Sequence, residues 1–572
     1  MLESGGSTLR LARTPSLSIL DDCPAWTWAL LLYLGVALAT VGSGVVAHPG
    51  RDCACLSAGT DPEIFMWSLA WWPHALLHGI NPFVSHAIWA PGGDNVAAAT
   101  TIPAAAIALW PVTALFGPVV AYNVLAILCP ALAALTAYLL CRRLRAGTVA
   151  ALAGGYLFGF SSYQLGQLLG HLNLTPVFLL PVIVHLAVRR VEQDISRQRF
   201  VACLGAVFVG QALLSTEILF DVAVIGALAL LLGYLIAEPP FRRHIQGLTA
   251  EVIVAAVGAI VVLSPYLEAA LSAAEPDRGG GLYSLNVANL VLPTPVTWLG
   301  GDLLRPVSRA FDGGNIVEAD GYLGIPILLG FVMYAMSAWH RRVARFLVAM
   351  TITSLVLAFG PALHVGGDTF GSLPWASLQL LPGFRSVVPS RLVVFATLAV
   401  AVGIALWLSD RDPRSARHWA VTGLGILALV PNVTGGLWGG APDNPAFFST
   451  GVAAHVLHPG EDLLTIPLGH NSTSLLWQAE TNFAFTLTGG YVSDVLPTAA
   501  RRNVAITELI AASQPGAHLP PRDIPRVRAF LAANHVRHIV VEPSYRRAWR
   551  TVLPRLARSD GDHGGVSLYA VR

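Results

Sequence analysis

The sequence predicts an α-helical polytopic membrane protein with about eleven transmembrane helices, a large first external loop with interfacial helices, and a small C-terminal external α/β domain. Of its 572 residues, 54% are hydrophobic and only 12% are charged, and the mean hydropathy is +0.61. Charge is therefore too scarce to cover a soluble surface. Apolar runs near the ~20 residues that a helix needs to cross a bilayer recur along the first three quarters of the chain.

Arginines cluster in every second connection between the apolar segments, as expected if those connections all lie on one side of a membrane. Seventeen arginines lie on the side that holds Arg10 and Arg13, against six on the other side before residue 439. The positive-inside rule then places the N-terminus in the cytoplasm and the C-terminal domain outside the plasma (inner) membrane. The eleven predicted spans are residues 26–46, 119–140, 149–167, 176–188, 200–216, 219–237, 252–268, 321–339, 346–360, 392–408 and 418–438.

One apolar segment, residues 102–118, tests this topology because it is short and interrupted by prolines. Counting it as a span would move Arg142, Arg143 and Arg145 outside and invert every later loop. We therefore expect the segment to lie in or re-enter the outer interface, where Trp110 suits the headgroup region. The transmembrane domain then covers residues 1–438, and its first external loop covers residues 47–118.

The tail from residue 439 to residue 572 changes character. Three short stretches, DLLTIPL, VRHIVVEP and VSLYAVR, read as strands, and residues 499–512 and 522–533 read as amphipathic helices. A segment of this length can bury a core of its own. We therefore expect residues 439–572 to form an extracytoplasmic α/β domain.

The stretch GTDPEIFMWSLAWWPHALLHGINPF, residues 59–83, places acids beside large rings just after the first span. Its apolar residues recur at helical spacing, and its aromatic side chains suit a helix seated in the membrane interface. Asp61 is well placed as the N-cap of that helix, which alone would explain it. Asp61 is equally well placed as a general base within reach of a lipid-borne substrate. The residues themselves leave both interpretations open.

Two arginines, Arg385 and Arg391, lie at the outer edge of a predicted span, against the positive-inside trend. An arginine in that position can snorkel or pair with an acid. Two arginines at the interface also suit a phosphate, because the guanidinium fork matches its oxygens. We favour the phosphate interpretation.

Histidines also collect in the first external loop, where His74, His78 and His86 accompany Asp61 and Glu63. Their spacing matches no familiar metal-ligand motif, and an interfacial helix with polar tips explains His74 and His78 as well. We therefore predict no metal and no cofactor. The net charge of only +2 does not suggest a nucleic-acid partner.

The six cysteines form neither a disulfide framework nor a zinc pattern. Cys53 and Cys55 are too close along the chain for an easy bridge, so we expect no disulfide between them. The sequence also lacks a Gly-rich phosphate loop and the G-x-S-x-G and H-E-x-x-H motifs.

Several segments taken together resemble the GT-C superfamily of membrane glycosyltransferases. An early acid in the first external loop is followed by HGINPFVSHAIWAPGGDN, FGPVVAYNVL and a span ending in LLCRRLRAG. The resemblance continues through GQLLGHLNLTP, GYLGIPILLG and LPGFRSVVPSRL to the external tail, so it covers nearly the whole chain.

The resemblance implies a sugar transfer from a polyprenyl-phosphate donor to a glycan, lipid or protein acceptor on the outer face. By match, Asp61 is the catalytic base, Glu63 is a second acid, and Arg385 and Arg391 hold the donor phosphate. A proline separates the two acids here, unlike the adjacent Asp-Glu of several family branches. Further candidate substrate contacts are His78, His171, Asn173, Glu318 and Asp320.

Two other functions fit the sequence. A lipid or saccharide transporter would show buried charge within the spans and symmetry between its halves, and neither is evident. A catalytically silent relative, whose external domain binds a glycan or a partner protein, remains open.

Overall fold

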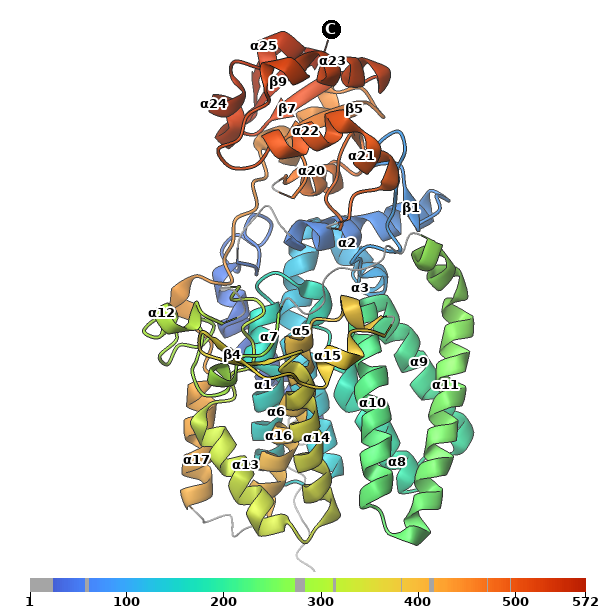
Figure 1. Ribbon diagram of the computed structural model, residues 1–572, viewed down its shortest axis with the longest axis vertical. Coiled ribbons are helices and arrows are strands. Elements are labelled where there is room, and N and C mark those ends of the chain that lie inside the picture. The colour runs from blue at the N-terminus through green and yellow to red at the C-terminus, as the bar shows by residue number, and fades with distance from the viewer. Residues whose placement is uncertain are drawn as a thin grey trace, which may run out of the picture.

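The computed structural model describes residues 24–56, 61–272, 283–311, 315–381, 383–410, 416–470, 472–493 and 495–571. Figure 1 shows a bundle of long helices and, beyond one end of it, a smaller domain built on a β-sheet. Helix α2 (Asp61–Leu77) lies across the bundle axis between these two parts. The junction between bundle and sheet domain is therefore where α2 and the outer loops meet.

Each of the eleven predicted spans overlaps at least one helix in the structure, although some, such as residues 149–167 and 418–438, are helical only in part. Five of these segments are long and apolar enough to cross a membrane by length and composition alone, so the chain is a multi-pass membrane protein, while the count of eleven crossings stays a prediction. The bundle helices are α1 (Ala25–Ala39), α5 (Pro118–Arg143), α6 (Thr148–Gly159), α7 (Ser162–Gln167), α8 (Leu179–Val191), α9 (Arg197–Leu214), α10 (Thr216–Ile236), α11 (Pro239–Ser272), α13 (Ile325–Ala338), α14 (Arg342–Ala358), α16 (Val393–Ser409) and α17 (Ala416–Ala428).

Helix α16 lies at the centre of one half of the bundle and is buried along nearly its whole length. Glycines allow its neighbours to approach closely, because a Cβ on Gly403 would lie 2.6 Å from the Phe331 ring. On the other side, a Cβ on Gly154 would lie 2.9 Å from Ala405 Cβ. Helix α11 instead exposes a broad apolar face that includes Val261 and Val262, as a lipid-facing helix does.

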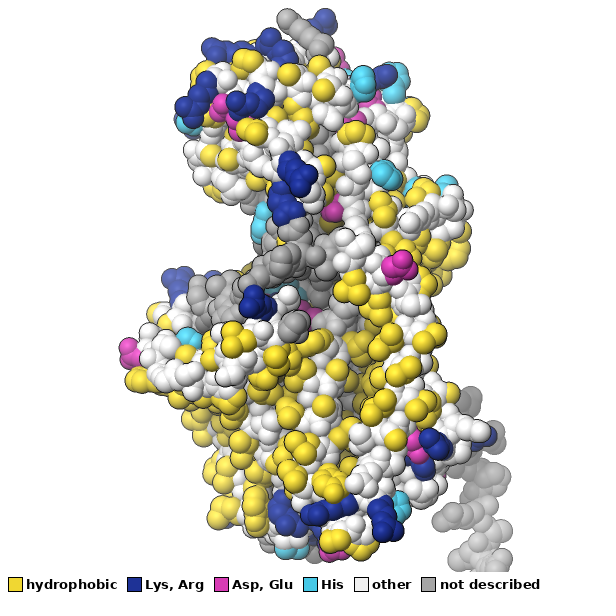
Figure 2. Space-filling view, turned by 45° about the vertical axis from the view of Figure 1, so that its right-hand side comes forward, with side chains coloured by type: hydrophobic (Ala, Val, Ile, Leu, Met, Phe, Trp, Pro, Cys, Tyr) yellow, Lys and Arg dark blue, Asp and Glu magenta, His cyan; other side chains and the backbone are white. Residues whose placement is uncertain are grey.

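Arginines gather at the end of the bundle opposite the sheet domain, where Figure 2 shows them below a broad hydrophobic band. Several are paired with acids there. Arg190 Nε donates to Glu251 at 2.7 Å, and Arg143 Nη1 lies 2.9 Å from Asp194. This arrangement matches the arginine-rich side predicted to face the cytoplasm.

The first external loop forms α2, the short hairpin β1 (Val84–Ser85) and β2 (Asp94–Asn95), and two short helices, α3 (Pro103–Ala108) and α4 (Trp110–Phe116). The segment 102–118 thus forms two short pieces rather than one long helix. The expectation that the aromatic side chains of α2 seat it in the lipid interface was wrong. Trp67 and Trp71 are buried because the sheet domain covers them.

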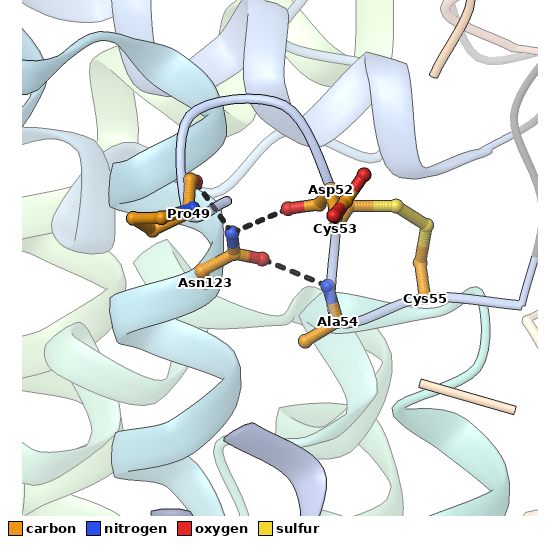
Figure 3. Close-up of a disulfide and its surroundings, with 6 residues drawn as sticks. All are labelled: Pro49, Asp52, Cys53, Ala54, Cys55 and Asn123. Atoms are coloured by element: carbon orange, nitrogen blue, oxygen red, sulfur yellow. Dashed lines mark hydrogen bonds between the residues drawn. A yellow bond between two sulfur atoms is a disulfide. The ribbon is translucent and has the colours of Figure 1, made fainter. Parts of the chain in front are cut away.

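The prediction that Cys53 and Cys55 do not pair was also wrong, because the structure joins them in a disulfide (Figure 3). The disulfide lies in a turn of the first external loop. Asn123 of α5 stabilises this turn with three hydrogen bonds. Its amide nitrogen donates to Pro49 O at 2.9 Å and Asp52 O at 2.8 Å, and its oxygen accepts from Ala54 N–H at 2.8 Å. A local turn brings the two sulfurs together, which spacing along the sequence did not reveal.

The C-terminal segment contains a five-stranded mixed sheet with strand order β6-β5-β7-β9-β8. The strands predicted from sequence are β5 (Asp462–Ile466), β7 (His538–Val541) and β9 (Val566–Val571); β6 (Thr486–Leu487) and β8 (Ala557–His563) were not predicted. Strands β5, β6 and β7 run parallel, whereas β9 is antiparallel to β7 and β8. The boundary at residue 439 itself stays a prediction.

Short helices surround this sheet and the outer rim of the bundle. The predicted segments 499–512 and 522–533 contain the longest ones of the domain. The helices of the domain are α18 (Ala446–Ser449), α19 (Ala453–Val456), α20 (Ser474–Glu480), α21 (Thr498–Arg502), α22 (Val504–Ala512), α23 (Ile524–Ala533), α24 (Arg546–Trp549) and α25 (Leu553–Leu556). The bundle rim adds α12 (Arg305–Ser308), the hairpin β3 (Leu363–Val365) and β4 (Asp368–Phe370), and α15 (Trp375–Leu378).

The membrane orientation can be tested by labelling single cysteines after Cys23 and Cys203 have been replaced by Ser. Gln514 and Gln246 are both exposed, Gln514 in the sheet domain and Gln246 at the opposite end of the bundle. We expect a membrane-impermeant maleimide to label Gln514→Cys in intact cells, and Gln246→Cys only after permeabilisation. The reverse pattern would invert the predicted topology.

Candidate active site

Asp61 is the first residue of α2, and its carboxylate faces a histidine from the bundle. Asp61 Oδ2 lies 3.3 Å from His171 Nε2, and the Asp61 side chain is 32% exposed. Asp61 therefore stands at the N-terminus of the helix, within one residue of the predicted cap position. The contact with His171 shows that Asp61 also belongs to a tertiary cluster, which a cap alone does not explain.

His171 follows α7 and is held from its other ring nitrogen. Nδ1 lies 2.9 Å from Gln167 Oε1 and 3.4 Å from Glu318 Oε1. Gln167, the last residue of α7, stands four residues earlier, so a local contact sets the plane of the ring. The imidazole is thereby fixed between two carboxylates, Asp61 and Glu318.

Arg391 continues the chain of contacts beyond Glu318. Its Nε donates to Glu318 Oε2 at 3.1 Å and its Nη2 to Glu318 Oε1, a two-pronged geometry that suits guanidinium and carboxylate. Its Nη1 donates to Glu217 at 2.6 and 2.7 Å. We call the series Asp61, His171, Glu318, Arg391 and Glu217 the charge chain.

The exposure of these side chains varies along the charge chain. Glu318 is only 1% exposed, whereas Asp61 is the most exposed member. Burial alone would raise the pKa of Glu318, but the charges of Arg391 and His171 and the hydrogen bonds to Glu318 outweigh it and lower the pKa. Glu318 is therefore an anion at neutral pH, and Asp61, at 32% exposure, is the most accessible member of the chain, followed by Glu217 at 23%.

Two further buried polar groups border the chain. Asp320 accepts a hydrogen bond from Gln167 Nε2 at 2.8 Å, so Gln167 links Asp320 to His171. Asn173 is buried two residues after His171. The structure thus brings Asp320 to the region that holds Asp61, and it places Asn173 close to His171 along the chain.

Three other predicted site residues differ in burial and in their place in the fold. Glu63 is buried on α2, and Arg385 is exposed, with its Nε donating to Gln379 O at 3.2 Å. His78 follows the far end of α2, about 25 Å along the helix axis from Asp61. There its ring packs at a tilt against that of His74, whose pKa is lowered by burial and by His78.

The sequence analysis did not assign roles to Gln167, Glu217 and Asp221. Asp221 is one turn along α10 from Glu217 and almost fully buried. A signal existed, because Asp221 lies within a predicted apolar span, Glu217 lies just before that span, and Gln167 stands four residues before His171. Neither of these sequence features shows which side chain the acid or the amide contacts.

No group of three or more His, Cys, Asp or Glu side chains is arranged to hold a metal ion within the ranges that the structure describes. The absence of a cofactor stays a prediction.

Carboxylates outnumber cationic side chains around the charge chain, so this region offers little net attraction to a further anion.

Comparisons with known proteins bear on the family and the fold. The model of a family described as "Domain of unknown function (DUF6311)" matches residues 30–430. No curated protein sequence matches the chain significantly.

Several solved structures share the fold at low sequence identity. Arabinofuranosyltransferase AftD from Mycobacteria aligns with a TM-score of 0.57 and 15% identity over 95% of this chain and 41% of its own. ArnT from Cupriavidus metallidurans, in its apo state, aligns at 0.51 and 13% over 96% and 98%. An oligosaccharyltransferase from Archaeoglobus fulgidus, in complex with Zn and sulfate, aligns at 0.50 and 10% over 91% and 68%.

The chain spans less than half the length of the mycobacterial protein, but nearly the full length of ArnT. ArnT has also been solved with undecaprenyl phosphate bound, and that structure aligns at 0.50 with 13% identity. The resemblance to GT-C membrane glycosyltransferases is thus confirmed at the level of the fold.

Proposed function

The chain belongs to the DUF6311 family, and from that premise we propose that it is a membrane glycosyltransferase that moves a sugar from a polyprenyl-phosphate donor to an acceptor hydroxyl. The observation that carries the proposal is the position of Asp61, which is the most exposed member of the charge chain and the one on the first external loop, beside His171. The fold shared with glycosyltransferases supports the reaction class. We place the reaction on the outer face of the inner membrane, with the N-terminus in the cytoplasm.

In the proposed mechanism, Asp61 accepts the proton of the acceptor hydroxyl as the oxygen attacks the anomeric carbon. The new glycosidic C–O bond forms while the bond from that carbon to the phosphate oxygen breaks. The polyprenyl phosphate leaves with the electron pair of that bond, and attack from the opposite face inverts the anomeric configuration. The role of His171 is to orient the Asp61 carboxylate toward the acceptor.

The charge chain changes the role that we propose for Arg391. Its guanidinium already binds two carboxylates, Glu318 and Glu217, and a phosphate would have to displace one of them. We therefore assign Arg391 to holding Glu318 in place. Arg385, which is exposed at the outer end of the bundle, is the better candidate for the donor phosphate.

The proposed activity is tested with purified protein and a panel of polyprenyl-phosphate pentoses and hexoses. We expect release of free polyprenyl phosphate together with a new glycoside for at least one donor. A transporter would move the intact donor between leaflets of a vesicle without cleaving it. A glycan-binding protein without activity would retain a glycan ligand and leave every donor intact.

Replacing Arg385 tests the phosphate contact. A charge-assisted hydrogen bond is worth about 1.5–3 kcal/mol, so Arg385→Ala should weaken donor use roughly tenfold to a hundredfold. Arg385→Lys should recover only part of the loss, because the planar fork is gone. The measurement is kcat/KM for the donor, with Arg309→Ala, an exposed arginine near α12, as the matched control. Equal kcat/KM in Arg385→Ala and wild type would remove Arg385 from the site.

A further inference from the structure

The sheet domain holds the middle of α2 through one buried amide, that of Gln478 on α20. Its Oε1 accepts a hydrogen bond from Trp67 Nε1 of α2 at 2.8 Å. Its Nε2 donates to Ala87 O of the first external loop at 2.7 Å and to Phe485 O of its own domain at 3.0 Å. Both Trp67 and Gln478 are fully buried, so one side chain joins the helix, the loop and the domain.

The first external loop also extends the sheet of the domain at its β6 edge. Leu487 N–H donates to Ala87 O at 2.8 Å, and Ala90 N–H donates to Leu487 O at 2.9 Å. Trp89 N–H donates to Gly489 O at 3.0 Å. These bonds add loop residues beside an edge strand, which would otherwise present unpaired backbone groups.

Rings of both parts complete the junction. Phe483 of the sheet domain packs edge-on against Trp67 and Trp71, with ring centroids 5.9 and 5.4 Å apart. Its centroid lies 4.5 Å from that of His74 on the same helix. The domain therefore grips α2 over two turns with both hydrogen bonds and aromatic contacts.

We propose that Gln478 is a positioning residue for Asp61, and that the sheet domain is thus a structural part of the active site. Trp67 is six residues from Asp61, about 9 Å along the same helix. Because the helix is rigid, the contacts between the sheet domain and Trp67 determine the position of the Asp61 carboxylate. Displacing a catalytic group by 1 Å can cost about a hundredfold in rate. The catalytic half of this inference rests on the proposed function.

Two variants and one control test the inference. Gln478→Leu removes all three hydrogen bonds of the amide. Trp67→Phe removes the indole N–H together with the five-membered part of the indole, while keeping a six-membered aromatic ring. Thr473→Val is the matched control, because Thr473 is buried in the same domain and its hydroxyl donates to Glu542 at 3.1 Å, away from α2. Hydrogen exchange of the α2 backbone amides is measured alongside turnover and donor KM.

We expect α2 to exchange roughly tenfold to a hundredfold faster in Gln478→Leu and Trp67→Phe, and at the wild-type rate in Thr473→Val. Turnover should fall at least tenfold in the first two variants with donor KM unchanged. Unaltered exchange of α2 in Gln478→Leu, or unaltered turnover despite faster exchange, would overturn the proposal. If the wild-type protein transfers no sugar, the proposed function fails, and the exchange rates alone decide whether Gln478 holds α2.

Discussion

Asp61→Asn is expected to lower turnover by ~10²–10⁴, the usual contribution of a positioned general base, while the melting temperature stays near the wild-type value. The substitution keeps the volume and the capping ability of the side chain, because Asn caps helices about as well as Asp. It removes only the proton acceptor beside His171. Sugar transfer and thermal unfolding in detergent measure the two quantities.

The capping interpretation makes the opposite forecast. If Asp61 only caps α2, Asp61→Asn should be almost silent, and Asp61→Ala should cost about 1 kcal/mol of local stability with activity largely kept. Asp94→Asn is the matched control, because Asp94 lies in the same external loop and its carboxylate accepts a hydrogen bond from Asn95 N–H. A fully active, well-folded Asp61→Asn protein would leave the proposed reaction without its base.

Arg391→Met is expected to destabilise the fold by about 3–5 kcal/mol, the usual cost of removing one partner from a buried ion pair. Glu318, only 1% exposed, would lose the guanidinium that holds its pKa down, so it would either stay charged without a partner or bind a proton at a cost in free energy, and Glu217 would lose the same partner. The melting temperature of the detergent-solubilised protein should fall accordingly. Donor use should fall as well, because the site loses its shape.

The compensating variant separates this role from phosphate binding. Arg391→Met combined with Glu318→Gln and Glu217→Gln removes the stranded charges, so much of the lost stability should return. If Arg391→Met instead melts like the wild-type protein and loses only donor affinity, Arg391 contacts the donor phosphate after all.

The helices of the bundle could be predicted because each one carries its own signal, a long apolar run with arginines at one end. The charge chain could not. Its five members come from five segments, and the pairing of Glu217 with Arg391 joins residues 174 positions apart. The sequence placed Asp61 in the external loop and Arg391 at the outer edge of a span, but only the packing of the bundle decides which side chains touch.

Helix α2 illustrates a second limit. Its run of tryptophans is typical of a membrane interface, and the same rings equally suit a protein interface, since both offer an apolar body and a polar tip. The contacts of α2 with Phe483 and Gln478 show that its rings form a protein interface, and these two residues lie more than four hundred positions away in the sequence. Cys53 and Cys55 show a local limit. The short separation of the two cysteines argued against a disulfide, but the turn between them brings their sulfurs together.

The junction between α2 and the sheet domain also has a consequence for biosynthesis, because α2 is made well before the domain that covers it. Trp67 and Gln478 are separated by 411 residues, and translation adds about 5–20 residues per second. The first external loop therefore leaves the translocation machinery roughly 20–80 seconds before its covering domain exists. During that interval its apolar rings and the backbone groups of residues 87–90 stand uncovered, where a membrane chaperone or a quality-control protease can bind them.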